Sequence, residues 1–381
     1  MIPVNKPSIT RVEKRAVMKA LNEGKISSQA GIVEEFEIEF AKKLNHKYAV
    51  AVNSGSSALF LLLKSLGIKK GDNVAIPDYS FIAVANAVAE CGANIVPVDC
   101  DLIYNIDPHK LEATLKRNKI KAVVIVHTYG IPCEMKYILE LKKRFKFVLV
   151  EDCCEALGTK GVGIGHSVYS FFASKTMTTG EGGMICTPNK KISEKCKSLR
   201  NYCKSKTDPY KHTGVGYNFR LTSLQAALGL AQLSRLKNLV SKRERLAYIY
   251  QNKLRQDNGL TIIPQKGSSY WAFPVFADDP KRLASHLKTM GIDTRGGFYP
   301  THLQFPYKMR LNTPLSVQTY NHTLTLPLYY DLTVKQVEYI AETINKYYEQ
   351  KGNLKVNDRR GGKGNIYCRN RKPVSNKKKC G

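Results

Sequence analysis

The sequence of 381 residues lacks long hydrophobic runs. Its apolar stretches, such as residues 123–126, have the length of a strand and are far too short to cross a bilayer. The first fifteen residues contain no apolar core of the kind that signal peptides carry. We therefore expect a soluble, cytoplasmic protein without a membrane partner.

Paired cysteines are also missing. None of the ten cysteines forms a C-x-x-C pair, and the adjacent Cys153 and Cys154 have poor geometry for a bridge to each other. This pattern argues against structural zinc and a disulfide framework. We expect reduced thiols and no bound metal.

Acidic residues are scarce, with 31 against 60 lysines and arginines, which gives a net charge of +29. Residues 351–381 hold eleven of these bases and one acid, so we expect a disordered basic tail there. A basic surface can attract anionic substrates or nucleic acid, or can consist of solvated lysines. We favour solvated lysines for the body of the chain and expect no nucleic acid partner.

Apolar strands alternate with helical segments through the first half of the chain. Strands are expected at residues 48–52, 74–77, 95–99, 122–127 and 147–151, with a capping box at Thr10 and Glu13 opening the first helix. This alternation predicts an α/β protein whose mainly parallel sheet is covered on both faces. We expect a large domain over residues 1–238 and a long helix over 223–256. That helix leads into a linker and smaller α/β domain over 239–350.

Four chemically useful side chains follow predicted strand ends: Ser56, Phe81, His127 and Asp152. Ligands of parallel sheets bind beyond these carboxyl ends. Residues 53–58 form a Gly/Ser turn before an apolar helix, where free N–H groups and the helix dipole attract a phosphate. Serines also simply cap helices, phenylalanine is often core, and a strand-end histidine is often only hydrogen-bonded.

Residues 148–187 carry the strongest chemical signal. A buried strand ends in Asp152, and a second strand-like run delivers Lys175 into a turn rich in threonine and glycine. A lysine that can form an imine and an acid that can protonate a pyridine nitrogen are what pyridoxal 5'-phosphate (PLP) requires. The alternatives are a solvated lysine and an acid that caps its strand. Residues 161–165 lack the G-x-G-x-x-G spacing, so we interpret them as a loop and not as a dinucleotide site.

Together these segments resemble the DegT/DnrJ/EryC1/StrS aminotransferases, which act on nucleotide-linked keto sugars. The similarity covers residues 2–348 and is closest to the perosamine synthetase-like 4-aminotransferases. Its motifs are NSGSSAL (53–59), PDYSFIAVANAV (77–88), HTYGIPCEM (127–135), EDCCEALG (151–158), SFFASKTMTTGEGG (170–183) and GYNFRLTSLQAALGLAQL (216–233). The resemblance implies the fold of type I PLP-dependent aminotransferases.

The resemblance also implies roles for individual residues. Lys175 would bind PLP covalently and Asp152 would pair with its ring nitrogen, so these two are the expected catalytic residues. The expected cofactor-binding residues are Ser56, Ser57 and Ser170 at the phosphate, Phe81 on the ring, Glu155 near the phenolic oxygen, and Asn218 at the cofactor of a second subunit. His127 would lie near the ring. An obligatory homodimer with shared sites follows from the role of Asn218.

The implied reaction moves an amino group from L-glutamate, which leaves as 2-oxoglutarate, by way of pyridoxamine 5'-phosphate. The acceptor would be C4 of a nucleotide-linked 4-keto-6-deoxyhexose. The product is then a 4-amino-4,6-dideoxy sugar of the perosamine or viosamine type, used in glycan biosynthesis. Relatives with histidine at the position of Lys175 deoxygenate instead of aminating. Lys25, Lys206 and Arg220 are candidates for contacts with the diphosphate.

Two other interpretations stay open at this point. One keeps the fold and cofactor but aminates a 3-keto sugar or modifies the sugar differently; the turn at residues 178–183 resembles the 4-keto branch and argues against it. The other is a non-catalytic, basic-tailed binding protein, against which the intact Lys175, Asp152 and Asn218 argue. The chain departs from the family pattern in a short loop over residues 159–169, in Cys154 and in Ile131.

Overall fold

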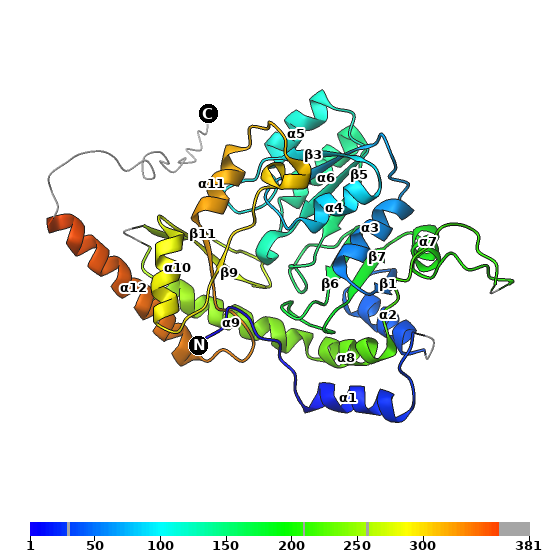
Figure 1. Ribbon diagram of the computed structural model, residues 1–381, viewed down its shortest axis with the longest axis horizontal. Helices are drawn as coiled ribbons and strands as arrows, with labels where there is room; N and C mark the ends of the chain where they lie inside the picture. The colour runs from blue at the N-terminus through cyan, green and yellow to red at the C-terminus, as the bar shows by residue number, and fades with distance from the viewer. Residues whose placement is uncertain (29–30, 209, 257–258, 358–381) are drawn as a thin grey trace, which may run out of the picture.

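Two β-sheets organise the protein, which the computed structural model describes over residues 1–28, 31–208, 210–256 and 259–357 (Figure 1). A seven-stranded sheet comes from the first half of the chain, and a four-stranded sheet from residues after 259. Apolar clusters cover both sheets. This is the predicted α/β class with a larger and a smaller sheet.

The seven-stranded sheet has the order β1-β7-β6-β5-β4-β2-β3. All its strands except β7 point the same way, so the prediction of a mainly parallel sheet is confirmed. Because β7 runs against β6, the connection between them stays at the carboxyl edge of the sheet. The strands are β1 (Tyr48–Val52), β2 (Asn73–Pro77), β3 (Asn94–Val98), β4 (Ala122–Val126), β5 (Val148–Asp152), β6 (His166–Ser170) and β7 (Gly183–Thr187).

Helices cover both faces of this sheet. Alternate residues of a strand point to opposite faces, so Val124 packs with one helical layer and Val123 with the other. Both positions are apolar, as expected for strands buried on two sides. One layer holds α3 (Gly55–Ser65), α4 (Ala83–Glu90) and α7 (Lys190–Arg200); the other holds α2 (Ile32–Lys43), α5 (Pro108–Arg117), α6 (Met135–Phe145) and α8 (Ser223–Ser234).

The four-stranded sheet is antiparallel, with the order β10-β11-β9-β8. Its strands are β8 (Leu260–Ile262), β9 (Phe273–Ala277), β10 (Arg295–Gly296) and β11 (Thr323–Leu326). The helices α9 (Leu236–Lys253), α10 (Pro280–Thr289) and α12 (Val334–Asn357) pack against it. The helix α11 (Pro314–His322) and the 3-10 turns η1 (Thr128–Gly130), η2 (Thr301–Leu303) and η3 (Phe305–Tyr307) complete the fold.

The first helix, α1 (Arg11–Asn22), lies along α8 (Figure 1). The capping box predicted at Thr10 and Glu13 is confirmed, and Glu13 is fully buried with Arg235 Nη1 at 2.5 Å. Arg235 separates α8 from α9, so the single helix expected over 223–256 is two helices. Near this break lies the predicted domain boundary at residue 238, which stays a prediction.

The last described helix is longer than expected. We predicted a disordered tail from residue 351, but α12 continues to Asn357. Lys351 Nζ lies 2.7 Å from Asp278 Oδ2, which ties this turn to the four-stranded sheet. The rest of the predicted tail, 358–381, lies outside the described residues. Among the described helices, none is both long and apolar enough to span a bilayer.

Candidate active site

Lys175 lies in the turn between β6 and β7, at the carboxyl edge of the large sheet. Backbone bonds from Phe171 N to Gly182 O (2.8 Å) and from Thr179 N to Phe171 O (2.9 Å) close this turn. The Lys175 side chain is 14% exposed, and its Nζ lies 3.6 Å from Glu155 Oε1. The antiparallel direction of β7 therefore places a nearly buried ammonium above the sheet.

Asp152 and Glu155 lie at the end of β5, the strand next to β6. Asp152 is buried, accepts a 2.9 Å hydrogen bond from Cys154 N, and forms no ion pair with any described lysine or arginine. Glu155 accepts a 2.8 Å bond from Tyr129 N, and burial raises the pKa of its carboxyl although Lys175 opposes the shift. A buried carboxylate without a cationic partner suits a protonated pyridine nitrogen.

The helix α3 begins beside these groups. Its N-cap Ser54 accepts a bond from Ser57 N, and a Cβ on Gly55 would lie 2.9 Å from Ser170 Cβ. The first turn of α3 thus sits directly against the end of β6, with Ser56 exposed and Ser57 half-buried. Serine hydroxyls and free helix N–H groups meet there, which fits the phosphate of PLP.

Aromatic rings form one wall of the site. Trp271 lies below Lys175, with Nζ 4.1 Å from the ring centroid, and its indole N–H donates to Ser174 O at 2.9 Å. Tyr129 stacks on Trp271 (6.3 Å between centroids) and on Phe298 (5.3 Å). Phe81 is 58% exposed and lies 6.4 Å from Phe298, so its ring is available for stacking on a ligand.

His127 occupies a different environment. Its Nε2 lies 3.2 Å from Glu151 Oε2, and its Nδ1 accepts from Cys133 N at 3.1 Å. Burial raises the pKa of Glu151, but His127 and the N–H groups of Gly163 and Gly165 together lower it below 4.5. Both ring nitrogens of His127 are therefore engaged, and its expected place near the cofactor ring stays a prediction.

A metal-like arrangement occurs at the same point. One ligand atom each of His127, Glu151 and Cys153 lies within 4.8 Å of the others. The imidazole and carboxylate already hydrogen-bond to each other and to backbone groups, while burial raises the pKa of the Cys153 thiol well above 9. We interpret the cluster as a hydrogen-bonded support for the loop at residues 159–165.

Asn218 lies apart from the other predicted residues. Its side chain is exposed, and within the described ranges no hydrogen bond joins it to Lys175, Asp152 or the serines. The backbone beside it is fixed, because Asn53 N donates to Phe219 O at 3.0 Å. An exposed side chain is what contact with a second subunit requires, and that role stays a prediction.

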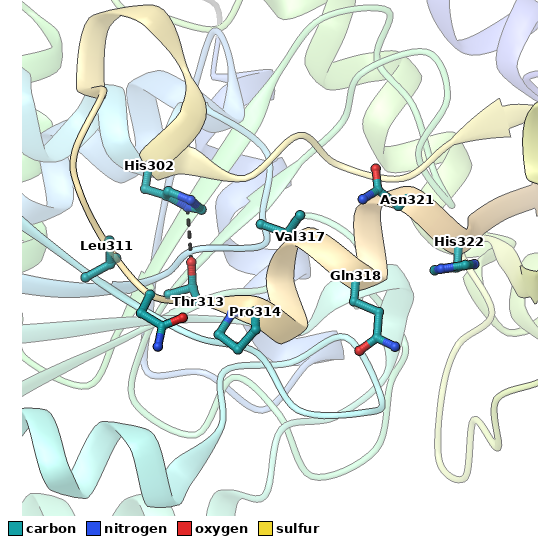
Figure 2. A pocket seen from close by; sticks show the side chains of 9 residues that line it. His302, Leu311, Thr313, Pro314, Val317, Gln318, Asn321 and His322 are labelled. Carbon is teal, nitrogen blue, oxygen red and sulfur yellow. Dashed lines mark hydrogen bonds between the residues drawn. The ribbon is translucent and has the colours of Figure 1, made fainter. Parts of the chain in front are cut away.

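A second polar cluster follows β2 and β3. Asp78 accepts bonds from His302 N (2.9 Å), from the His302 ring (2.7 Å to Nδ1) and from Thr313 Oγ1 (2.8 Å). Figure 2 shows a pocket lined by His302 and Thr313, whose side chains face each other, and by Val317, Gln318 and Asn321 of α11. Thr313 and its neighbours thus join the two sheets.

Trp271, Tyr129, Phe298 and Arg295 were not predicted from the sequence. Trp271 and Arg295 reach the site from the four-stranded sheet, about a hundred residues beyond Lys175. The one available signal was that Trp271 is the single tryptophan of the chain.

Comparison with known proteins agrees with this geometry. The profile described as "DegT/DnrJ/EryC1/StrS aminotransferase family" matches residues 7–345. The chain is 35% identical over 365 residues to a GDP-perosamine synthase of Escherichia coli O157:H7, covering 92% of this chain and 99% of that protein. It is 33% identical over 374 residues to a GDP-perosamine synthase of Vibrio cholerae, covering 91% and 99%.

A solved structure shows the same fold. The Helicobacter pylori aminotransferase PseC, described as involved in the biosynthesis of pseudoaminic acid, superposes with a TM-score of 0.87 at 28% identity. The match covers 92% of this chain and 99% of that one. The agreement therefore extends over both sheets.

Proposed function

The chain belongs to the DegT/DnrJ/EryC1/StrS family of PLP-dependent sugar aminotransferases, and on that premise we propose that it aminates C4 of a nucleotide-linked 4-keto-6-deoxyhexose. The predictions of the family, of its fold, of an enzymatic activity and of the PLP cofactor are confirmed. The acceptor, the donor L-glutamate, the homodimer and the cytoplasmic location belong to the proposal.

One observation carries the assignment of the reacting residue. Lys175 is a nearly buried lysine at a strand end, with a carboxylate 3.6 Å away and an aromatic face below it. PLP, when bound, supplies an electron sink for the carbanion formed at the donor's α-carbon. We assign to Lys175 Nζ the removal of the proton from that carbon and, during the amination, the delivery of a proton to the acceptor carbon of the sugar, as general base and then general acid.

The neighbouring residues hold this geometry. Asp152 pairs with no lysine or arginine among the described residues and would keep the pyridine nitrogen protonated. Glu155 would stay beside Lys175 and orient its ammonium. Ser56, Ser57 and Ser170 would donate to the phosphate at the start of α3, and Phe81 would cover one ring face. Asn218 would complete the site of a second subunit.

The choice of sugar nucleotide rests on the relatives. Two proteins that cover nearly the whole chain at 33–35% identity are GDP-perosamine synthases, which favours a GDP-linked acceptor. Among the basic candidates for the diphosphate, Lys25 is paired with Glu23 (2.8 Å), and Arg220 donates to Asn201 (2.9 Å). Lys206 forms no ion pair with a described residue, which makes it the first to substitute.

The test is an incubation of the PLP-loaded protein with L-glutamate and GDP-, dTDP- and UDP-linked 4-keto-6-deoxyhexoses. We expect a 4-amino-4,6-dideoxy product, identified by mass spectrometry and NMR, from the GDP-linked sugar. Amination at C3, or conversion without nitrogen transfer, would contradict the proposal and support the other sugar-modifying activities. Sedimentation at several concentrations tests the homodimer separately.

A further inference from the structure

A buried arginine of α9 lies outside the candidate active site. Arg243 is 3% exposed, and its Nε is buried without a hydrogen bond to any described residue. Burial lowers the pKa of its guanidinium to about 10, and no described acid opposes the shift. A buried cation without a carboxylate costs stability, so this position calls for a contact that an apolar side chain cannot make.

The Arg243 guanidinium binds two backbone carbonyls beside the four-stranded sheet. Its Nη1 donates to Trp271 O at 2.9 Å and to Leu328 O at 2.8 Å. The last pair of β11 with β9 is Leu326 with Phe273. The two carbonyls lie two residues beyond this pair, one on each chain. Arg243 therefore joins the two chains where their own ladder has ended.

These bonds fix one end of Trp271, and the Lys175 turn fixes the other. The indole N–H donates to Ser174 O at 2.9 Å, and Lys175 Nζ lies 4.1 Å from the ring centroid. Tyr270, the residue before Trp271, has a φ of 51°, a left-handed conformation that a side chain of this size rarely adopts. Such a conformation persists only where its surroundings hold it, so the backbone at Trp271 needs an anchor.

A second donor of α9 shows what docking of this helix alone requires. Tyr250 follows Arg243 by about two helical turns, so both side chains share one face of α9. Tyr250 is fully buried, and its hydroxyl donates to Pro327 O at 3.0 Å, next to Leu328 in the chain. Tyr250 thus binds the chain that leaves β11, whereas Arg243 binds this chain and Trp271 as well.

We infer that Arg243 is a positioning residue, which holds the indole of Trp271 under Lys175 from the side of α9. The inference rests on the proposed role of Lys175. The indole face attracts the Lys175 ammonium, and its N–H holds the backbone of the neighbouring Ser174. A displacement of Trp271 would therefore move Lys175, and misplacement of a reacting group by about 1 Å can cost 10²-fold in rate.

Arg243→Met tests the inference in full-length, PLP-loaded protein, because methionine donates no hydrogen bond. Nitrogen-15 labelling gives one indole N–H resonance, since Trp271 is the single tryptophan of the chain. Exchange of this proton with solvent shows whether it still donates to Ser174 O. We expect the exchange to become at least about 10-fold faster. Turnover at saturating substrates should fall about 10- to 100-fold.

Arg243→Lys keeps a cation that can reach one carbonyl, and it should lose only about 3- to 10-fold in both measurements. This variant carries the test if Arg243→Met does not fold. Tyr250→Phe is the matched control, because it removes the other buried bond of α9 to the same chain. Its indole exchange and its turnover per folded molecule should stay within about 2-fold of the unsubstituted protein.

A double substitution shows whether Arg243 acts through Trp271. In a Trp271→Phe protein the indole is already missing, so Arg243→Met should lower turnover by less than about a further 3-fold. A further loss of the full 10- to 100-fold would overturn the inference.

Two other outcomes would overturn it: unchanged indole exchange and turnover in a folded Arg243 variant, or the same losses in Tyr250→Phe, which would make docking of α9 the cause. Failure of the proposed function looks different. In that case the unsubstituted protein transfers no amino group from any donor. The indole exchange needs no turnover and then decides the role of Arg243 alone.

Discussion

Buried acids lie at two places along the carboxyl edge of the seven-stranded sheet, after β2 and β3 and after β5, and they differ in their hydrogen-bond partners. After β2 and β3, Asp78 accepts from His302 and Thr313, and Asp99 accepts from Ser316 N at 2.8 Å and Ser316 Oγ at 2.7 Å. After β5, Asp152 accepts one backbone bond from Cys154 N and pairs with no described lysine or arginine. The acids are alike in burial and differ in how fully the protein satisfies them.

This difference separates support from chemistry. A carboxylate whose oxygens are filled by protein donors stabilises the fold and has no capacity left for a ligand. A buried carboxylate with few partners is costly and is retained where a ligand completes it. The β2–β3 half thus joins the four-stranded sheet to the large one, and the β5–β6 half holds the groups that we propose to react.

The largest effect is expected from Lys175→Ala, which removes the amine that we propose to react. Turnover should fall by at least about 10⁴-fold, the upper range for a positioned acid–base group. The Lys175→Ala protein, after incubation with PLP, should also lack the visible absorbance of the covalently held cofactor. Circular dichroism and thermal unfolding check that the fold is intact. A variant with normal turnover would remove Lys175 from the reaction.

Asp152→Ala should lower turnover about 10³-fold, because the pyridine nitrogen loses its counter-ion. The free energy of unfolding should change by less than about 1 kcal/mol, since a single backbone bond is lost. Steady-state kinetics and urea unfolding give the two numbers. If Asp152→Ala were strongly destabilised while its folded fraction kept normal kinetics, Asp152 would belong with the acids that support the fold.

Asp78→Ala should show the reverse pattern. We expect a loss of roughly 3 kcal/mol in unfolding free energy, because His302 and Thr313 are left buried without their acceptor. Turnover per folded molecule should stay within about 3-fold. Thr313→Val, which removes one hydrogen bond, should cost about 1 kcal/mol and serves as the graded control. If Asp78→Ala lowered turnover without lowering the unfolding free energy, the distinction between supporting acids and reacting acids would be wrong.

Among the substitutions of Lys175 and the three acids, Glu151→Gln gives the smallest effect, and it tests the acid that precedes Asp152 in β5. The pKa of Glu151 is lowered below 4.5 in the folded protein, so its contribution is complete above that pH and is lost as the pH falls through the lower, native value. We expect the variant to be about 2 kcal/mol less stable at pH 7. The gap should narrow below pH 4.5. Unfolding followed from pH 7 to 3 measures it, and a constant gap would exclude titration of Glu151.

Much of the reacting half was visible in the sequence. The alternation of apolar strands with helical segments predicted the order of elements, and the rule that ligands bind at carboxyl edges placed Asp152 and Ser56 in one site. Residue roles such as that of Asn218 came from family resemblance and remain to be tested.

The rest depends on long-range packing. Nothing local in the five residues of β7 fixes their direction, although that direction decides where Lys175 lies. Trp271 and Arg295 belong to segments whose pattern indicates only a strand and its neighbours, and their place beside Lys175 comes from the docking of the second sheet. The contact between His127 and Glu151 could not be predicted either, because the sequence does not show toward which face of the sheet an acid at a strand end points.

The position of Trp271 makes this protein its own optical probe. Because it is the single tryptophan and its ring centroid lies 4.1 Å from Lys175 Nζ, all indole fluorescence originates directly beside the lysine that we propose to react. A cofactor that absorbs where indole emits would quench that light by energy transfer. Loading, loss and turnover of the cofactor can therefore be watched in unlabelled protein, in real time and at low concentration.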